Sequence, residues 1–142
     1  MAKLGIKEMD NQETIKLMRD MAMDASQKAY SPYSKAKIGS TVLTVERKYF
    51  SGSNVENSSY GATICAERVA ILKAVSNGFT KLSKIYVYSK DGWPPCGMCR
   101  QMISEFATND LEIIIGDKEG NERVYKFTEL FPEAFTPEHL RK

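Results

Sequence analysis

The sequence is short of several features, and each shortage argues against a class of protein. No run approaches the roughly 18 consecutive apolar residues that a membrane-spanning helix needs, so we expect no membrane association. The 20 Lys and Arg residues are nearly balanced by 18 Asp and Glu residues and are scattered among them, which argues against a nucleic-acid partner. The first ten residues lack the apolar segment of a signal peptide, so we expect a cytoplasmic location.

Cysteine and histidine are also scarce, with three cysteines and one histidine in 142 residues. Three cysteines cannot all pair within one chain, and two of them form a Cys-x-x-Cys unit. In a reducing compartment this favours metal or redox chemistry over a disulfide framework. The hydrophobic content of 42% and charged content of 27%, without repeats or linkers, predict a single globular domain over residues 1–142.

The hydrophobic pattern predicts helices that alternate with strands. Apolar spacing predicts helices over residues 12–30, over 65–76 and from about 96, with short helical pieces at 128–130 and after 137. Strands are expected over residues 38–45, 49–55, 85–88, 111–115 and 123–127. Residues 91–95, with one Gly and two Pro, must form a loop. This order favours an α/β domain in which helices cover a mixed sheet.

All three cysteines fall at the starts of predicted helices. A helix N-terminus offers free N–H groups and the positive end of the helix dipole, which lower the pKa of a thiol. Zinc binds thiolates, and Cys65, Cys96 and Cys99 would leave its fourth tetrahedral position open for water, as in a catalytic site. Glu67, two residues after Cys65, can take a proton from that water and deliver it to a substrate.

Two other interpretations of these residues are open at this point. A Cys-x-x-Cys pair also occurs in redox proteins, although that leaves Cys65 and Glu67 without a role. A structural zinc site needs a fourth ligand, and His139, the single histidine, lies far along the chain near its C-terminus.

The motifs Cys-Ala-Glu-Arg at 65–68 and Pro-Cys-Gly-Met-Cys-Arg-Gln at 95–101 resemble the small cytidine deaminases with three cysteine ligands. Further matches at residues 33–35, 54–57 and 131–135 extend the resemblance over nearly the whole chain. It implies a three-layer α/β/α sandwich with a mixed five-stranded sheet. It also implies zinc-dependent hydrolytic deamination of cytidine or 2′-deoxycytidine to the uridine product, with release of ammonia, in pyrimidine salvage.

The resemblance further implies roles for residues around the motifs. Asn54 and Glu56 would hold the ribose hydroxyls, and an amide and a carboxylate two residues apart at a strand end suit a diol. Arg68 would donate hydrogen bonds to the cysteine sulfurs, and its charge would help to offset the net negative charge of Zn²⁺ with three thiolates. The backbone N–H of Ala66 and the carbonyl of Pro94 would contact the edge of the base.

The family's assembly and one departure complete the sequence-based expectations. The resemblance implies a homotetramer with shared active sites, in which Tyr60 and Phe135 reach into neighbouring subunits unless they are core aromatic residues. Ala36 stands where the family usually has an aromatic residue that packs on the pyrimidine. This departure leaves open a deaminase of modified or 4-substituted pyrimidine nucleosides, or of a nucleoside antibiotic. A non-catalytic zinc-binding interaction module is the alternative from another class.

Overall fold

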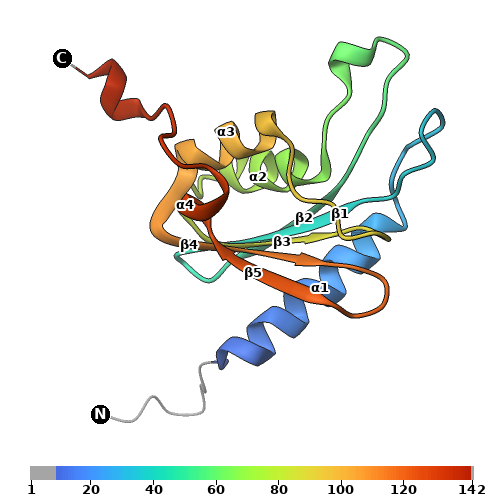
Figure 1. Ribbon diagram of the computed structural model, residues 1–142, viewed down its shortest axis with the longest axis horizontal. Coiled ribbons are helices and arrows are strands. Elements are labelled where there is room, and N and C mark those ends of the chain that lie inside the picture. The colour runs from blue at the N-terminus through green and yellow to red at the C-terminus, as the bar shows by residue number, and fades with distance from the viewer. Residues whose placement is uncertain (1–8, 142) are drawn as a thin grey trace.

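Helices cover both faces of a five-stranded sheet in the computed structural model, which describes residues 9–141 (Figure 1). The elements in chain order are α1 Asn11–Ser26, β1 Gly39–Thr44, β2 Tyr49–Ser53, η1 Tyr60–Ala62, α2 Ala66–Ser76, β3 Leu82–Tyr88, α3 Gly97–Phe106, β4 Ala107–Gly116, β5 Glu122–Lys126, α4 Phe127–Leu130 and η2 Pro137–Leu140. The strand order is β2-β1-β3-β4-β5, with β3 and β4 parallel and the other pairs antiparallel. The predicted α/β class and mixed five-stranded sheet are confirmed.

The central strands contribute side chains to two separate hydrophobic cores, because successive side chains point to opposite faces of the sheet. In β3, Ile85 and Val87 point to the face covered by α2 and α3, and Tyr86 points to the face covered by α1. The first core contains Val42, Ile71, Ile85, Val87, Ile103, Ile113 and Ile115, and the second contains Met18, Ala22, Leu43, Tyr86 and Ile114. The sandwich follows from this alternation.

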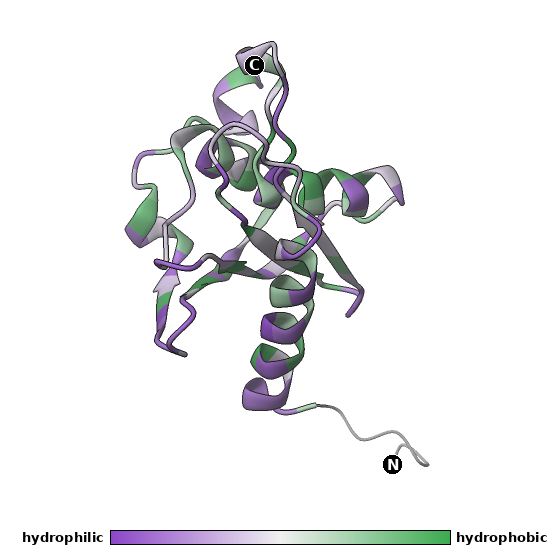
Figure 2. Cartoon of the chain, turned by 90° about the vertical axis from the view of Figure 1, so that its right-hand side faces the viewer, coloured by the Kyte–Doolittle hydropathy of each residue, from purple (hydrophilic) through white to green (hydrophobic). Residues whose placement is uncertain are grey.

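Helix α1 is amphipathic, with hydrophilic and hydrophobic residues alternating along it in Figure 2. Asp10 caps its first turn by accepting a hydrogen bond from the Glu13 N–H at 2.8 Å. Among residues 9–141, no helix has the length and apolar character needed to cross a bilayer.

The predicted end of α1 at residue 30 is wrong, since the helix stops at Ser26. Tyr30 pairs instead with Val55, because its N–H donates to the Asn54 carbonyl and its own carbonyl accepts from the Glu56 N–H. The strands differ as well. β2 ends at residue 53 rather than 55, and β3 and β4 begin at residues 82 and 107, earlier than the apolar pattern predicts.

Three loops that carry the motif residues meet the sheet at the same end of its strands. Gly39, the first residue of β1, lies opposite Ser53 at the end of β2 and opposite Tyr88 at the end of β3. The segments 31–38, 54–65 and 89–96 therefore start or end beside one another. The register of the sheet places the chain entering α2 next to the chain entering α3.

A polar cluster ties α1 to the far edge of the sheet. Arg19 donates two hydrogen bonds to the Glu122 carboxylate, at 2.6 and 2.9 Å, and the Tyr86 hydroxyl donates a third at 2.5 Å. The hydrogen bond from Arg19 is the largest cause that holds the pKa of Glu122 below its ordinary value. The carboxylate thus joins a helix and two strands that are distant in sequence.

We expect Glu122→Gln to lower the free energy of unfolding by about 1.5–3 kcal/mol, the range for hydrogen bonds to charged groups. The depressed pKa makes the carboxylate's contribution complete above the ordinary pKa of Glu and lost as the pH falls through the folded-state value. Urea titrations should therefore show the difference from the parent protein shrinking below about pH 4. The control Glu119→Gln, at an exposed carboxylate before β5, should change stability little. An equal loss in both variants would contradict the role of the cluster.

Candidate active site and metal centre

The three cysteines come together where two helices begin. Cys65 is the N-cap of α2, Cys96 is the N-cap of α3, and Cys99 lies in the first turn of α3. The Cys96 sulfur is 3.7 Å from the Cys65 sulfur and 3.4 Å from the Cys99 sulfur, and all three sulfurs lie within 4.8 Å of one another. A tetrahedral zinc ion with Zn–S bonds of about 2.3 Å holds its sulfurs roughly 3.8 Å apart. The donor set therefore fits a zinc ion.

No fourth protein ligand from residues 9–141 accompanies these sulfurs. Over residues 9–141, the group of His, Cys, Asp and Glu side chains close enough to share a metal ion consists of Cys65, Cys96 and Cys99. His139 instead bonds to Thr136 and stacks on Phe135 in the C-terminal segment. This arrangement matches a centre with one coordination position left for water or substrate, and it does not match a closed structural site.

Hydrogen bonds and charge at the cluster favour a thiolate at Cys65. The hydrogen bond from the Cys99 thiol is the main cause that lowers the pKa of Cys65, to about 5, with help from Arg68 and Cys96 and against the opposing effect of burial. The same pairing with Cys65, together with burial, raises the pKa of Cys99. Arg68 donates from Nη2 to the Cys65 sulfur at 3.7 Å, and its buried Nε has no hydrogen-bond partner among the described residues. The guanidinium thus supplies the positive charge that three thiolates with Zn²⁺ require.

Glu67 is a buried carboxyl beside the cysteines. It lies in the first turn of α2, and only 4% of it is exposed. Burial is the main cause that raises the pKa of Glu67 to about 7, and the nearby Cys65 adds to the rise while Arg68 opposes it. A carboxyl that is buried at a stability cost next to a cluster of metal ligands is typical of a general acid or base.

Asn54 and Glu56 lie near each other, but both side chains already bind backbone. The Asn54 amide donates to the Ala36 carbonyl and accepts from the Ile38 N–H, each at 2.9 Å. The Glu56 carboxylate accepts from the N–H groups of Tyr33 and Ser34, at 3.0 and 3.1 Å, and from the Ser34 hydroxyl. That hydroxyl is the main cause of the lowered pKa of Glu56. The pair therefore fixes the loop 31–38, a task that the sequence did not reveal.

The two residues expected to contact the base through their backbones have different surroundings. Ala66 is fully buried at the first position of α2, where N–H groups lack intrahelical partners. Pro94 is exposed in the loop before α3. The neighbouring carbonyl of Pro95 accepts a hydrogen bond from Arg100 Nε at 2.8 Å. The carbonyl that already has a partner within the protein is therefore that of Pro95, next to the one expected to contact the base.

Tyr60 and Phe135 project into solvent. Tyr60 is 77% exposed in η1, packs its edge on Tyr33, and shares a hollow of about 280 Å³ with Tyr33, Glu56 and Thr63. Phe135 is 54% exposed, and its carbonyl accepts from the Gln101 side chain at 2.9 Å. Neither ring is therefore buried in the core of the single chain, and the alternative that they are core aromatic residues is wrong.

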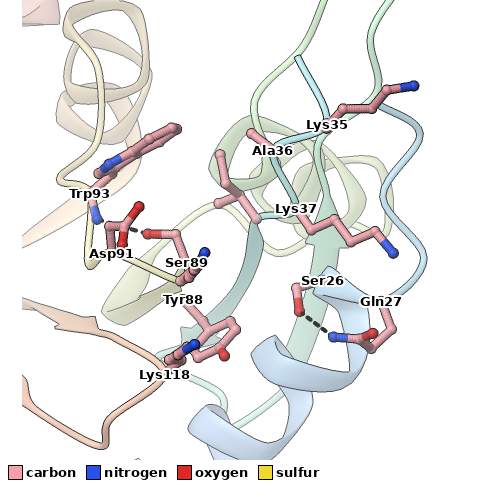
Figure 3. Close-up of a pocket in the computed structure, with 12 residues that line it drawn as sticks. Ser26, Gln27, Lys35, Ala36, Lys37, Tyr88, Ser89, Asp91, Trp93 and Lys118 are labelled. Carbon is pink, nitrogen blue, oxygen red and sulfur yellow. Dashed lines mark hydrogen bonds between the residues drawn. The ribbon is translucent and has the colours of Figure 1, made fainter. Parts of the chain in front are cut away.

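Two residues near the site were missed by the sequence analysis. Arg100, directly after Cys99, donates to the carbonyls of Pro95 and Leu130, at 2.8 and 2.6 Å, and so ties the loop before Cys96 to α4. Trp93 lines a cavity of about 350 Å³ together with Ala36 and Ile38 (Figure 3). A charged residue inside the motif and a tryptophan three residues before a metal ligand were the available signals.

Comparison with known proteins agrees with this geometry. Residues 12–115 match the family model described as the cytidine and deoxycytidylate deaminase zinc-binding region. The chain is 39% identical to a cytidine deaminase of Halalkalibacterium halodurans, over 93% of this chain and 98% of the relative. It is 43% identical to a probable cytidine deaminase of Dictyostelium discoideum, over 92% and 89% of the two chains.

Solved structures show the same likeness. The crystal structure of cytidine deaminase from Burkholderia pseudomallei matches with a TM-score of 0.82 and 36% identity, covering 89% of this chain and all of the other. That of cytidine deaminase from Mycobacterium tuberculosis matches with a TM-score of 0.75 and 32% identity, covering 85% and 96%.

We predict that Cys65→Ser, Cys96→Ser and Cys99→Ser each abolish tight zinc binding, since two thiolates remain where three are needed. Elemental analysis after dialysis should find about one zinc per chain in the parent protein and near none in the variants. Met98→Ala, an exposed position between two of the cysteines, is the matched control and should keep its zinc. Full zinc content in any of the serine variants would remove that residue from the ligand set.

Proposed function

Because the chain belongs to the cytidine and deoxycytidylate deaminase family, we propose that it is a zinc-dependent enzyme that converts cytidine and 2′-deoxycytidine to the corresponding uridines. The observation that carries the proposal is the grouping of Cys65, Cys96 and Cys99 at two helix N-termini beside the buried Glu67. Relatives named cytidine deaminase, aligned over most of both chains, support the choice of substrate.

The reaction adds water to C4 of the pyrimidine and removes ammonia. Zinc, when bound, supplies Lewis-acid chemistry that makes water a nucleophile near neutral pH. Glu67 takes one proton from the attacking water and passes it to N3 as the water oxygen bonds to C4. Glu67 then takes the remaining hydroxyl proton and passes it to the amino group. The C4–N bond breaks, ammonia leaves, and the C4 carbonyl of uridine forms.

Other groups hold the nucleoside. We assign the free N–H of Ala66 and the carbonyl of Pro94 to the edge of the base, since Arg100 occupies the carbonyl of Pro95. Asn54 and Glu56 would receive the ribose hydroxyls with the hydrogen-bonding capacity that remains to them, since a carboxylate has about four acceptor sites and an amide can make four hydrogen bonds. Their bonds to loop 31–38 would hold both side chains in place before the substrate arrives.

We also propose that the enzyme is a homotetramer whose active sites are completed by neighbouring chains. The large exposed surfaces of Tyr60 and Phe135 support this, as do the exposed Met98 and Leu72 on the helices of the same layer. Figure 1 shows η1 and the C-terminal segment projecting from the side of the sheet that α2 and α3 cover. Sedimentation of the purified protein measures the assembly, and a monomer would contradict the proposal. The cytoplasmic location and the role in pyrimidine salvage stay predictions.

The two alternatives have less support. Modified or 4-substituted nucleosides and nucleoside antibiotics appear in none of the relatives' names given above, so Ala36 alone does not carry that substrate class. A non-catalytic zinc module would have no use for Glu67, whose burial costs stability.

We predict that Glu67→Ala folds and binds zinc but loses nearly all turnover of cytidine, by a factor of about 10³ or more, because the substitution removes the carboxyl assigned to both proton transfers. Loss of the cytosine absorbance band measures turnover, and elemental analysis measures the metal. Glu105→Ala, at an exposed carboxylate on α3, is the control and should keep full activity. An active Glu67→Ala protein would refute the assignment of Glu67. A zinc-loaded parent protein that leaves cytidine unchanged would refute the proposed function.

A further inference from the structure

The side chain at position 36, where the family usually has an aromatic residue that packs on the pyrimidine, is small in this chain. Ala36 presents one methyl group, and it is held in place because its carbonyl accepts from Asn54. Beside it lies the cavity of about 350 Å³ that Ala36, Ile38 and Trp93 line. In Figure 3 the indole of Trp93 lies across this space from Ala36, and the amino ends of Lys35 and Lys37, which also line the cavity, point away from Trp93. The other residues that line it come from the end of α1, the loop before β1, the end of β3 with the loop after it, and Lys118, and none of the cysteines is among them.

The loop that carries Trp93 is held rigidly. The Trp93 N–H donates to the Ser89 hydroxyl at 2.7 Å, and the Gly92 carbonyl accepts from Arg123 at 2.6 Å. Gly92 has a φ of 70°, a conformation that favours glycine, and two prolines follow the tryptophan. The backbone at Trp93 is therefore fixed, which reduces the entropy that a ring loses when it packs on a ligand.

The indole itself is not part of either core. It is 51% exposed, and it lies three residues before Cys96 in the same loop as Pro94, whose carbonyl we assign to the base. A large half-exposed aromatic surface facing a cavity next to a base-binding loop is suited to stacking, because every base has a flat π-face.

We propose that Trp93 supplies the aromatic surface for the pyrimidine base that position 36 lacks, so that Ala36 and Trp93 form a compensating pair across the pocket. The ring comes from the loop before α3 instead of from the loop before β1. Ala36 is then the partner that leaves room for the indole, and it does not mark a weakened or widened pocket. This inference rests on the proposed deamination of cytidine and names the residue that sets affinity for the base.

Trp93 is the single tryptophan of the chain, so its fluorescence reports on this position alone. With the zinc-loaded protein and uridine, the product, as the probe, we expect a saturable change in emission and protection of the indole from acrylamide quenching. The measurement does not depend on turnover. Emission and quenching that stay unchanged at saturating uridine would overturn the proposal.

Substitution separates stacking from a structural role. We expect Trp93→Leu to raise KM for cytidine about 10-fold with little change in kcat, as for a contact made equally in the ground and transition states. Trp93→Phe, which keeps a ring, should recover most of that loss. Adding Ala36→Phe to Trp93→Leu should also lower KM, whereas Ala36→Phe alone should not, because the indole already fills the space.

The outcomes distinguish this inference from the proposed function. A parent protein that deaminates cytidine while Trp93→Leu keeps its KM refutes the pairing and leaves the function intact. A Trp93→Leu protein that loses kcat and zinc, without recovery in Trp93→Phe, assigns Trp93 to folding and also refutes it. A zinc-loaded parent protein that neither turns over cytidine nor binds uridine refutes the function itself.

Discussion

The site depends on the meeting of two helix N-termini over one edge of the sheet. Helices α2 and α3 each begin at a cysteine. The strands before them, β2 and β3, end on the same side of the sheet because both run antiparallel to β1. Gathering thiolates costs free energy through their mutual repulsion. Two helix dipoles and Arg68 reduce that cost, and a divalent ion would offset the rest. The glycine at position 52 lets α2 approach the sheet, since a Cβ there would lie 2.7 Å from the Ala70 nitrogen. The position of Cys65 therefore follows from sheet register and helix packing.

The segments around this centre are held by hydrogen bonds more than by core packing. Asn54 and Glu56 bind the backbone of loop 31–38, Arg100 joins the Pro95 carbonyl to α4, and Ser89 fixes the start of the loop that carries Trp93. Each of these polar side chains binds backbone that has no strand or helix partner. The exposed segments around the metal centre are thereby fixed without being buried.

The local sequence pattern was enough to predict the α/β class, the mixed sheet and the helices that start at the cysteines. The order of helices and strands and the positions of helix starts depend on residues that are close together in the sequence. The end of α1 was not predictable in this way, since Tyr30 leaves the helix for partners at residues 54–56. The hydrogen bonds from the Asn54 side chain to loop 31–38 were missed for the same reason, because the partner residues lie 16 and 18 positions away. Ala36 was singled out as a departure from the family pattern, but its proposed counterpart Trp93 becomes visible only when the two loops are placed together. Local sequence patterns do not show which loops lie side by side at the ends of the strands, because that depends on how the strands pair.

The most direct test of the central claim, that three cysteines hold one metal ion and leave a position open, is X-ray absorption at the zinc edge of the purified protein. The account predicts about three sulfur neighbours near 2.3 Å and one lighter oxygen or nitrogen neighbour. Four sulfurs, which would need a cysteine from another chain, would indicate a closed structural site. A shell with fewer than three sulfurs would contradict the ligand set on which the proposed chemistry depends.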